Sequence, residues 1–426
     1  MKKTHTKRWL AAMVGLWLAC STHSALFAEP TTTDSVVPAG DSAASAAVPA
    51  PSGPADRWIN GFNNEIEKPL NRLGTALGGA VFTGMVDTYA AFDFNQPASD
   101  TVGLRLFDPR ANQYALNLAE FGVVKTPTSN SPFGYNFTLG YGNAMNVVNT
   151  GDTSFLRYLK EAYTSYLAPV GKGLQIDVGK FVTPDGFEVI ESNSNWNYSR
   201  SLLFNYAIPF YHFGARAKYV FNDKYSLTGY VVDGWNNVTS GFVSGLHTGA
   251  LSFAWNVTKK VSVTETWMGG PGATPQDAGH WRNLLDSVIT YNPTSKLSLA
   301  GWGDYGRSEG TIVSSQPVKW WGAAGYVKYQ FNPLYAAAIR YEYYNDPDGF
   351  TIGGYYNGIF SLAPREHIQA ITATVERQVT PHVIARAEFR HDLSSAPVFQ
   401  KGGLNSPVSD QSTVAGGFIF VLAPAK

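Results

Sequence analysis

Apolar and polar residues alternate with a period of two through most of this chain, from about residue 81 to residue 422. In 335–343, apolar or aromatic residues hold every second position, while Arg340 and Glu342 stand at intervening positions. Successive side chains of a strand point to opposite faces, so this alternation predicts half-buried β-strands. Over the same residues no helical period appears, and no apolar run reaches the roughly 18 residues of a membrane-spanning helix.

Sixteen segments of this kind can be marked along the chain, and they begin near residues 81, 113, 133, 156, 174, 211, 225, 247, 261, 281, 297, 320, 335, 367, 383 and 413. Alternation breaks at Glu120, which predicts a bulge or a change of face near the second segment. The connections alternate strictly between short and long. The short ones are Thr126–Pro132, Ala168–Gly173, Phe221–Lys224, Asn256–Lys260, Asn292–Lys296, Phe331–Leu334 and Gln378–His382. They are rich in the residues of tight turns, and the connections between them have roughly 12 to 29 residues.

This sorting of loop lengths predicts the fold. A transmembrane β-barrel has antiparallel strands, short periplasmic turns and long extracellular loops. A soluble β-sandwich also contains alternating strands, but it gives no reason for loop lengths to differ between its two ends. We therefore expect an all-β, antiparallel up-and-down transmembrane barrel of about 16 strands, within a range of roughly 14 to 18. An even strand number returns both ends of the barrel to the periplasm.

Charged positions indicate which face of a strand points inward. In 383–390, Arg386, Glu388 and Arg390 share one face. A basic residue on the lipid face costs about 2 to 4 kcal/mol at mid-bilayer, so this face is expected to line the lumen. A barrel of about 16 strands is wide enough to hold water. The 23 Tyr and 11 Trp residues suit aromatic girdles at the two membrane interfaces.

The first 28 residues have the layout of a secretory signal peptide. Basic residues precede an apolar run from Trp9 to Cys20, and small residues follow it. A membrane anchor is the alternative, but this run is too short for a bilayer that needs about 20 helical residues. We expect 1–28 to be removed and the mature chain to begin near Glu29. Cys20 is the only cysteine, so the mature chain would carry no thiol.

Two further segments precede the barrel, which we assign to 80–426. Residues 29–56 are almost wholly Ala, Pro, Ser, Thr, Gly, Val and Asp, and we interpret them as a disordered periplasmic leader. In 57–79, apolar residues recur at the spacing of a helix face, namely Trp58, Phe62, Ile66, Leu70, Leu73 and Leu77. Pro69 is expected to break this short periplasmic helix in two. The helix either rests on the rim of the barrel or serves as a linker.

The charge balance excludes one class of partner. The whole chain has 32 basic and 32 acidic residues, and loss of 1–28 leaves 28 basic residues, a net charge of minus four. An acidic balance argues against nucleic acid. Outer-membrane lipid and small polar solutes are the partners that a membrane barrel implies.

Two segments carry a resemblance to a known family. Residues 179–211 read GKFVTPDGFEVIESNSNWNYSRSLLFNYAIPFY and lead to Gly-Ala-Arg at 214–216, and residues 385–394 read ARAEFRHDLS. Over most of its length after about residue 80, the chain resembles the beta-barrel porin-2 family of bacterial outer-membrane proteins. The resemblance implies an outer-membrane barrel of porin type and brings no catalytic residues. One departure is that an assembly signal usually ends on a terminal aromatic residue, whereas Phe420 is followed by six more residues.

The longest connection, 182–210, is the third long one in the chain. In general porins, to which the chain is similar in strand number, the third extracellular loop folds into the lumen and narrows it. We hypothesise the same here, with opposed charges across a constriction that orders water and favours polar solutes. The candidate constriction residues are Asp185, Glu188, Glu191, Arg216, Arg340, Glu342, Arg386, Glu388 and Arg390. Alternatively, Arg340 with Glu342 and Arg386 with Glu388 form wall ion pairs that only hold the barrel interior together.

Three residues of the same loop are candidates for solute contact. Trp196, Asn197 and Arg200 combine a stacking surface with polar donors, as a sugar site does. They suit a role in the loop's own fold equally well.

Other function classes have weaker support. An outer-membrane enzyme needs a nucleophile beside a base, but the histidines are scattered, and His391 and Asp392 are adjacent on a strand and therefore point to opposite faces. No nucleotide, phosphate or zinc motif appears, so we expect no enzyme, metal or cofactor. A non-conducting structural or adhesive barrel stays open. A homotrimer follows only by analogy with general porins.

Overall fold

The computed structural model describes residues 61–238, 247–271, 279–311, 315–356, 359–361, 365–403 and 405–422. The predicted signal peptide (1–28), the predicted leader (29–56) and the first residues of the predicted helical segment (57–60) lie outside the described residues. Within the described residues, no helix is both long enough and apolar enough to cross a membrane.

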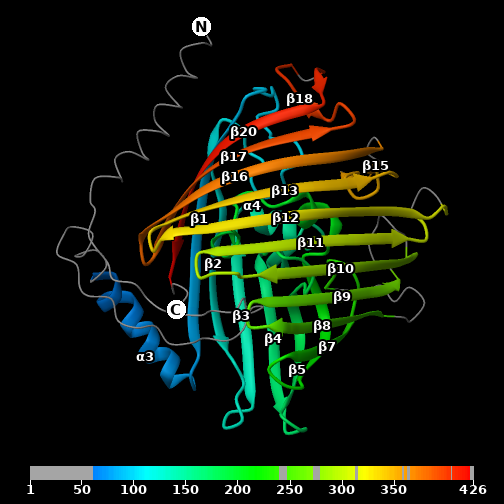
Figure 1. Cartoon of the computed structure of the whole chain (residues 1–426). Coiled ribbons are helices and arrows are strands. Elements are labelled where there is room, and N and C mark those ends of the chain that lie inside the picture. The colour runs from blue at the N-terminus through cyan, green and yellow to red at the C-terminus, as the bar shows by residue number, and fades with distance from the viewer. Residues whose placement is uncertain are drawn as a thin grey trace.

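Sixteen antiparallel strands of the described residues form a closed barrel (Figure 1). Each strand pairs with the next, and the barrel closes between its last and first strands, where Asp93 lies opposite Thr413. The barrel strands are β1 (Val81–Asp93), β2 (Gln113–Lys125), β3 (Phe133–Tyr141), β4 (Leu159–Ala168), β5 (Leu174–Val182), β6 (Tyr211–Val220), β7 (Tyr225–Val232), β8 (Thr248–Thr258), β9 (Val261–Pro271), β10 (Trp281–Tyr291), β11 (Leu297–Ser308), β12 (Val318–Asn332), β13 (Tyr335–Asp346), β16 (Glu366–Thr380), β17 (Val383–Ser394) and β20 (Asp410–Val421).

The predicted all-β barrel of sixteen strands is confirmed. Most strands begin at or next to the predicted residue, and the largest offsets are at β4, which begins at Leu159 instead of 156, and at β20, which begins at Asp410 instead of 413. The predicted bulge is displaced. The pairing register of β1 and β2 shifts at Asn117, which has no partner on β1. Glu120 pairs regularly with Met85. The Asn117 amide donates to the buried Asp87 carboxylate at 2.6 Å, which explains why the irregularity lies at Asn117.

Side-chain chemistry closes the short turns. The Asn222 side-chain oxygen accepts hydrogen bonds from the backbone N–H groups of Lys224 and Tyr225 at 2.8 and 3.1 Å. Asn332 does the same for Leu334 and for Tyr335, the first residue of β13. These contacts replace backbone pairs that a tight turn cannot form, which is why Asn recurs there.

The opposite end of the barrel carries the long connections, several of which contain short elements. These are α4 (Asn143–Val148), η2 (Ser154–Tyr158), η3 (Ser192–Ser194), η4 (Leu203–Ala207), the ribbon of β14 (Gly354–Tyr356) and β15 (Ile359–Ser361), and the ribbon of β18 (Phe399–Gln400) and β19 (Pro407–Val408).

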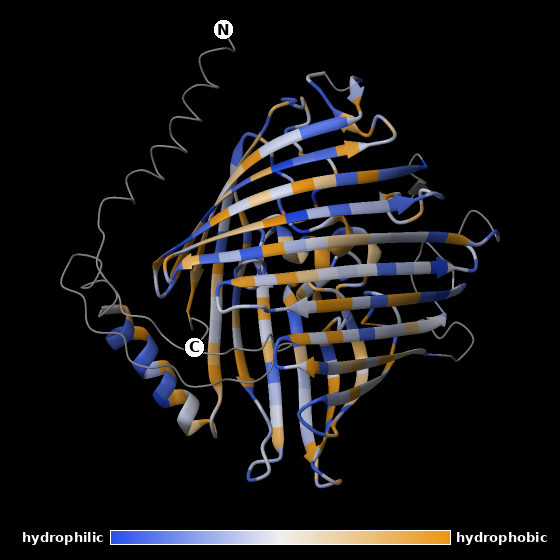
Figure 2. Ribbon diagram, in the orientation of Figure 1, coloured by the Kyte–Doolittle hydropathy of each residue, from blue (hydrophilic) through white to orange (hydrophobic). Residues whose placement is uncertain are grey.

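The two faces of the wall differ in polarity, and Figure 2 shows the alternation as bands of colour along the strands. The outward-pointing Ile289 and Phe389 are exposed, whereas the inward-pointing Arg340 and Glu342 are fully buried. Aromatic rings stand near both ends of the outer face. Tyr225 stacks on Trp255 beside the short turns, with centroids 6.2 Å apart. Trp321 contacts Tyr343 toward the long-loop end at 5.2 Å. The outer face therefore has the apolar band and girdles of a membrane wall.

A helix precedes β1 at the short-turn end. It consists of the π-helix η1 (Asn63–Glu67) and the α-helix α3 (Lys68–Ala76). At the expected break, the helix changes type: η1 ends at Glu67 and α3 begins at Lys68, directly before Pro69, and the backbone angles stay helical through both residues. The helix touches the rim, since the Phe62 ring contacts His382 at 4.8 Å.

Candidate functional site: the loop inside the barrel

The connection between β5 and β6, residues 183–210, lies inside the barrel, and we call it the inner loop. The Tyr198 hydroxyl donates to Asp87 of β1 at 2.9 Å. The Gly186 N–H donates to Asp286 of β10 at 3.1 Å. Strands β1 and β10 are nearly opposite in the closed order of strands, so the loop crosses the lumen. It is drawn in green within the wall in Figure 1.

Near its start, the loop places one carboxyl group beside a buried carboxyl group of the wall. Asp185 accepts a hydrogen bond from the Thr183 hydroxyl at 2.9 Å and lies close to Asp286. The Trp302 indole N–H also donates to Asp286, at 2.6 Å. Burial and the Asp286 carboxylate raise the pKa of Asp185 to about 8. Asp185 therefore carries a proton at neutral pH, which avoids two unshielded negative charges side by side.

Gly186 makes the sharp turn that follows. Its φ angle is +97°, a conformation that side-chain-bearing residues rarely adopt. A Cβ atom at this position would lie 2.9 Å from both Ile208 and Trp302. Only glycine fits both the backbone angle and the space.

A chain of buried ion pairs joins the loop to β13 and β17. Glu188 pairs with Arg340 at 2.7 Å, and Arg340 pairs with Glu342 at 3.1 Å. Glu342 continues to Arg390 at 3.3 Å, and Arg390 to Asp392 at 2.7 Å. All five side chains are at most 2% exposed. Charges this far from water are costly unless paired, so the set holds together as a unit.

Other wall charges bind the loop backbone. The Glu388 carboxylate of β17 accepts from the Tyr198 N–H at 2.6 Å. The Arg386 guanidinium donates to the carbonyl oxygens of Ser192 and Asn195 at 2.5 and 2.7 Å. An irregular loop inside a barrel has backbone groups that no sheet can pair, and the wall supplies their partners.

The loop is also held on another side of the lumen. Lys160 of β4 pairs with Glu191 of the loop and with Glu120 of β2, the latter at 2.7 Å. The two loop acids Glu188 and Glu191 thus reach strands β13 and β4, which are well separated around the barrel.

The predicted constriction residues fall into two groups. The first lies in or against the inner loop and consists of Asp185, Glu188, Glu191, Arg340, Glu342, Arg386, Glu388 and Arg390. The loop acids Glu188 and Glu191 touch wall bases directly instead of facing them across a gap, and Asp185 lies beside Asp286. The second is Arg216 of β6, which pairs with Asp177 at 2.7 Å and has a side chain that is 21% exposed.

Of the two alternative wall pairs, one forms and one does not. Arg340 pairs with Glu342. Arg386 pairs with Glu376 at 2.5 Å, while Glu388 binds the loop backbone and the Thr374 hydroxyl.

The candidate solute-contact residues make contacts within and around the loop. Asn197 is buried and donates to the Thr374 hydroxyl of β16 at 2.7 Å. Arg200 is buried and donates to two carbonyl oxygens of the loop itself. Trp196 is half-buried, with its ring edge-on to Phe187 at 5.0 Å.

A comparison with protein families identifies the fold family. The model described as "Putative beta-barrel porin-2, OmpL-like" matches residues 80–422. The chain belongs to this family. The resemblance carried by residues 179–211 and 385–394 is therefore confirmed, and the porin-2 barrel is an outer-membrane fold.

Solved structures of other porins share the fold of this porin-2 chain. An anion-selective porin from Comamonas acidovorans is 12% identical, covers 80% of this chain and 99% of its own, and has a TM-score of 0.54. The outer membrane channel DcaP of Acinetobacter baumannii is 9% identical, with coverages of 80% and 96% and a TM-score of 0.51. Salmonella typhi OmpF, in a complex with daunomycin, is 12% identical, with coverages of 80% and 97% and a TM-score of 0.50. A search of curated proteins found no match.

Several residues that hold the inner loop were not predicted from sequence. Asp87 and Asp286 stand at inward positions of β1 and β10. The alternation along these strands predicts that their side chains point inward, but it does not predict that they bind the loop. The first long loop also reaches inside, where Arg105 pairs with Asp108 at 2.9 Å and both are buried. No period marks such a loop contact in a sequence.

Toward the short turns, the inward face of β7, β8 and β9 in this porin-2 barrel is small and polar, while nearer the long loops it carries the buried Tyr230, Val232 and Met268. The side chains of this polar strip, each partly exposed, are Ser226, Thr228, Ser252, Ser262 and Thr264. They alternate with outward-pointing exposed residues such as Leu227 and Leu251. The wall under the inner loop is different, because Arg340 and Arg390 have no exposed surface there.

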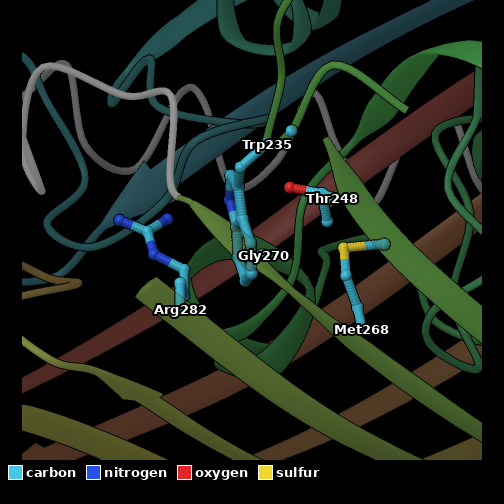
Figure 3. Close-up of a pocket in the computed structure, with 6 residues that line it drawn as sticks. Trp235, Thr248, Met268, Gly270 and Arg282 are labelled. Carbon is cyan, nitrogen blue, oxygen red and sulfur yellow. The ribbon is translucent and has the colours of Figure 1, made fainter. Parts of the chain in front are cut away.

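A small cavity lies near the long-loop end of the lumen (Figure 3). Arg282 stands on one side of the Trp235 indole, with 4.6 Å between the guanidinium and the ring, and Thr248 and Met268 stand on the other. The cavity volume is about 10 Å³, room for a single water molecule, so it is not a solute site. Among the described residues, no group of three or more His, Cys, Asp or Glu is arranged to hold a metal ion.

Proposed function

We propose that this chain is a porin through which small hydrophilic solutes diffuse passively along a water-filled lumen narrowed by the inner loop. The observation that carries the proposal is the attachment of the loop by Glu188 to β13 and by Glu191 to β4. A loop fixed at both sides narrows the lumen without needing to move. Passive diffusion requires no cofactor and no energy source, only a polar path through an apolar wall.

The passage runs between the inner loop and the polar strip. Hydroxyl groups of the strip offer hydrogen bonds to water and to polar solutes without binding either tightly. Arg216 adds a basic group to this side, and its pairing with Asp177 orients it. The other candidate constriction residues set the position of the loop, and through it the width of the passage.

The proposal extends to export and assembly. Residues 1–28 direct secretion, and residues 29–56 and both ends of the mature chain lie in the periplasm. An even number of strands supports this, as does the position of α3 at the same end of the barrel as the end of β20 (Figure 1). Three copies form a homotrimer, as in general porins. Chemical crosslinking in intact cells followed by gel electrophoresis tests the trimer, and protease treatment of intact cells tests the location of a C-terminal tag.

Single-channel current across a planar lipid bilayer tests the main function. The protein purified from the outer membrane is expected to give stepwise conductance, and a salt gradient across the bilayer then gives its ion selectivity. Stable insertion without current contradicts the porin proposal and favours a structural or adhesive barrel.

The enzyme alternative gains no support from its best candidate constellation. His391 points outward, where its Nδ1 lies 2.9 Å from the Ser412 hydroxyl. Asp392 points inward and pairs with Arg390. The wall thus separates a base from the acid that would orient it.

A further inference from the structure

The helix formed by η1 and α3 has an apolar stripe that the rest of the described chain leaves open. Ile66 of η1, Leu70 and Leu73 of α3, and Leu77 at the C-cap of α3 follow one another at spacings of four, three and four residues. Ile66, Leu73 and Leu77 are 42%, 48% and 45% exposed. Large apolar side chains exposed side by side mark a contact surface and are not an ordinary solvent face.

An aromatic contact places the beginning of the helix at the outer edge of the barrel rim. The Phe62 ring packs edge-on against Phe420 at 5.3 Å. Phe420 points outward, since it alternates along β20 with the fully buried Ile419. At the other end of the helix, the Ala80 N–H donates to the Gly74 carbonyl oxygen at 3.0 Å, and the chain continues directly into β1. The helix therefore lies at the short-turn end of the barrel, beside the start of β1 (Figure 1), and its first residues contact the outward-facing Phe420.

The stripe is continuous with the lipid-facing band of the wall. On the outer face of β1, next to the end of the helix, Val86 is 43% exposed. Phe62 joins the same band through Phe420. The polar face of the helix carries Lys68 and Arg72, and both basic side chains stand away from the stripe.

We propose that α3 is an interfacial helix whose stripe of Ile66, Leu70, Leu73 and Leu77 rests on the periplasmic leaflet of the outer membrane. A helix in this plane buries its apolar face at the boundary between headgroups and acyl chains, while its basic residues reach the headgroups. The proposal rests on the proposed orientation, with the short turns in the periplasm, and not on conduction. It fixes the start of β1 at the height of the membrane surface.

Depth-dependent quenching tests the proposal in the full chain. Cys20 is the only cysteine, so a Cys20→Ser background leaves an introduced cysteine as the sole site for an environment-sensitive dye. Leu73→Cys places the dye on the stripe, and Asn71→Cys is the matched control on the polar face of the same turn. The labelled proteins are reconstituted in vesicles of phosphatidylethanolamine and phosphatidylglycerol that contain a nitroxide-bearing acyl chain. Quenching is expected to be several-fold stronger at position 73 than at position 71.

Two outcomes overturn the proposal. Equal and weak quenching at both positions means that the stripe faces water. Disulfide-linked dimers of Leu73→Cys under mild oxidation, without lipid quenching, mean that a second copy of the chain covers the stripe. The pair Leu77→Cys and Thr75→Cys repeats the comparison if a label at position 73 prevents assembly. Conductance recorded from the same vesicles separates a failure of this proposal from a failure of the porin proposal.

Discussion

Glu188 of the inner loop and Arg340 of β13 form a fully buried ion pair at 2.7 Å across 152 residues of sequence. Arg340 also binds Glu342 and the Ser199 carbonyl oxygen, so one guanidinium joins the wall to two points of the loop. A contact of this kind decides where the loop lies in the lumen. It also makes the loop position sensitive to a single residue.

Glu188→Ala is expected to loosen the inner loop. It leaves part of the Arg340 guanidinium buried without its partner, at a cost on the order of 3 kcal/mol. Heat denaturation followed by gel mobility should show a lower midpoint, and single-channel recordings should show larger current fluctuations. Glu309→Gln is the matched control, because Glu309 pairs with Arg307 where both side chains are about half exposed, and such pairs contribute about 0 to 1 kcal/mol. Unchanged recordings and melting in Glu188→Ala would mean that the pair does not position the loop.

The fold was predictable because its determinants are local. A period of two, hydroxyl and amide side chains at the turns, and the lipid-facing cost of charges such as Arg390 each act over a few residues. Together, these patterns predict the number of strands, the residues at which the strands begin and end, and the face of each strand that points into the lumen. Pro69 shows the limit of local reasoning, since the helix changes from π to α geometry directly before the proline and continues beyond it.

The site was predictable only in part. The wall charges Arg340, Glu342, Arg386 and Glu388 point inward as expected, because the phase of their strands determines it. Their partners depend on the path of the inner loop, and no period governs that path. Glu388 binds the Tyr198 N–H, and Arg386 pairs with Glu376, which lies directly opposite it on the neighbouring strand.

The inner loop is expected to loosen as pH rises. The pKa of Asp185 is about 8, raised from 3.8 by burial and by Asp286, so the folded protein holds a proton that the unfolded chain has lost. The stabilisation is fully present below pH 3.8 and is lost as pH rises through about 8. Single-channel recordings between about pH 6 and about pH 9 should show fluctuations that grow with a midpoint near 8. Asp185→Asn should weaken this dependence, and an identical pH profile in wild type and variant would refute the assignment.

Gly186→Ala is expected to displace the start of the inner loop. The added Cβ would stand 2.9 Å from Ile208 and Trp302 at a φ angle of +97°, so both sterics and backbone oppose it. We expect the free energy of unfolding, derived from the thermal denaturation midpoint, to fall by about 1 to 3 kcal/mol. The conductance is expected to change as well. Gly325→Ala is the matched control, because Gly325 is an exposed wall residue whose added Cβ would meet nothing within 4 Å. Equal effects of the two substitutions would mean that the turn at Gly186 tolerates a side chain.

Arg216 is expected to influence the charge preference of the channel. It is the candidate constriction residue that stands apart from the inner loop, and its 21% exposure lets its charge act on ions in the lumen. Arg216→Gln removes a positive charge and leaves Asp177 unneutralised, so the reversal potential in a salt gradient should shift toward cation preference. Arg307→Gln removes the same charge from an exposed position near the end of β11 and should shift it much less. If both variants keep the wild-type reversal potential, ions do not pass near Arg216, and the passage must lie elsewhere than between the inner loop and the polar strip.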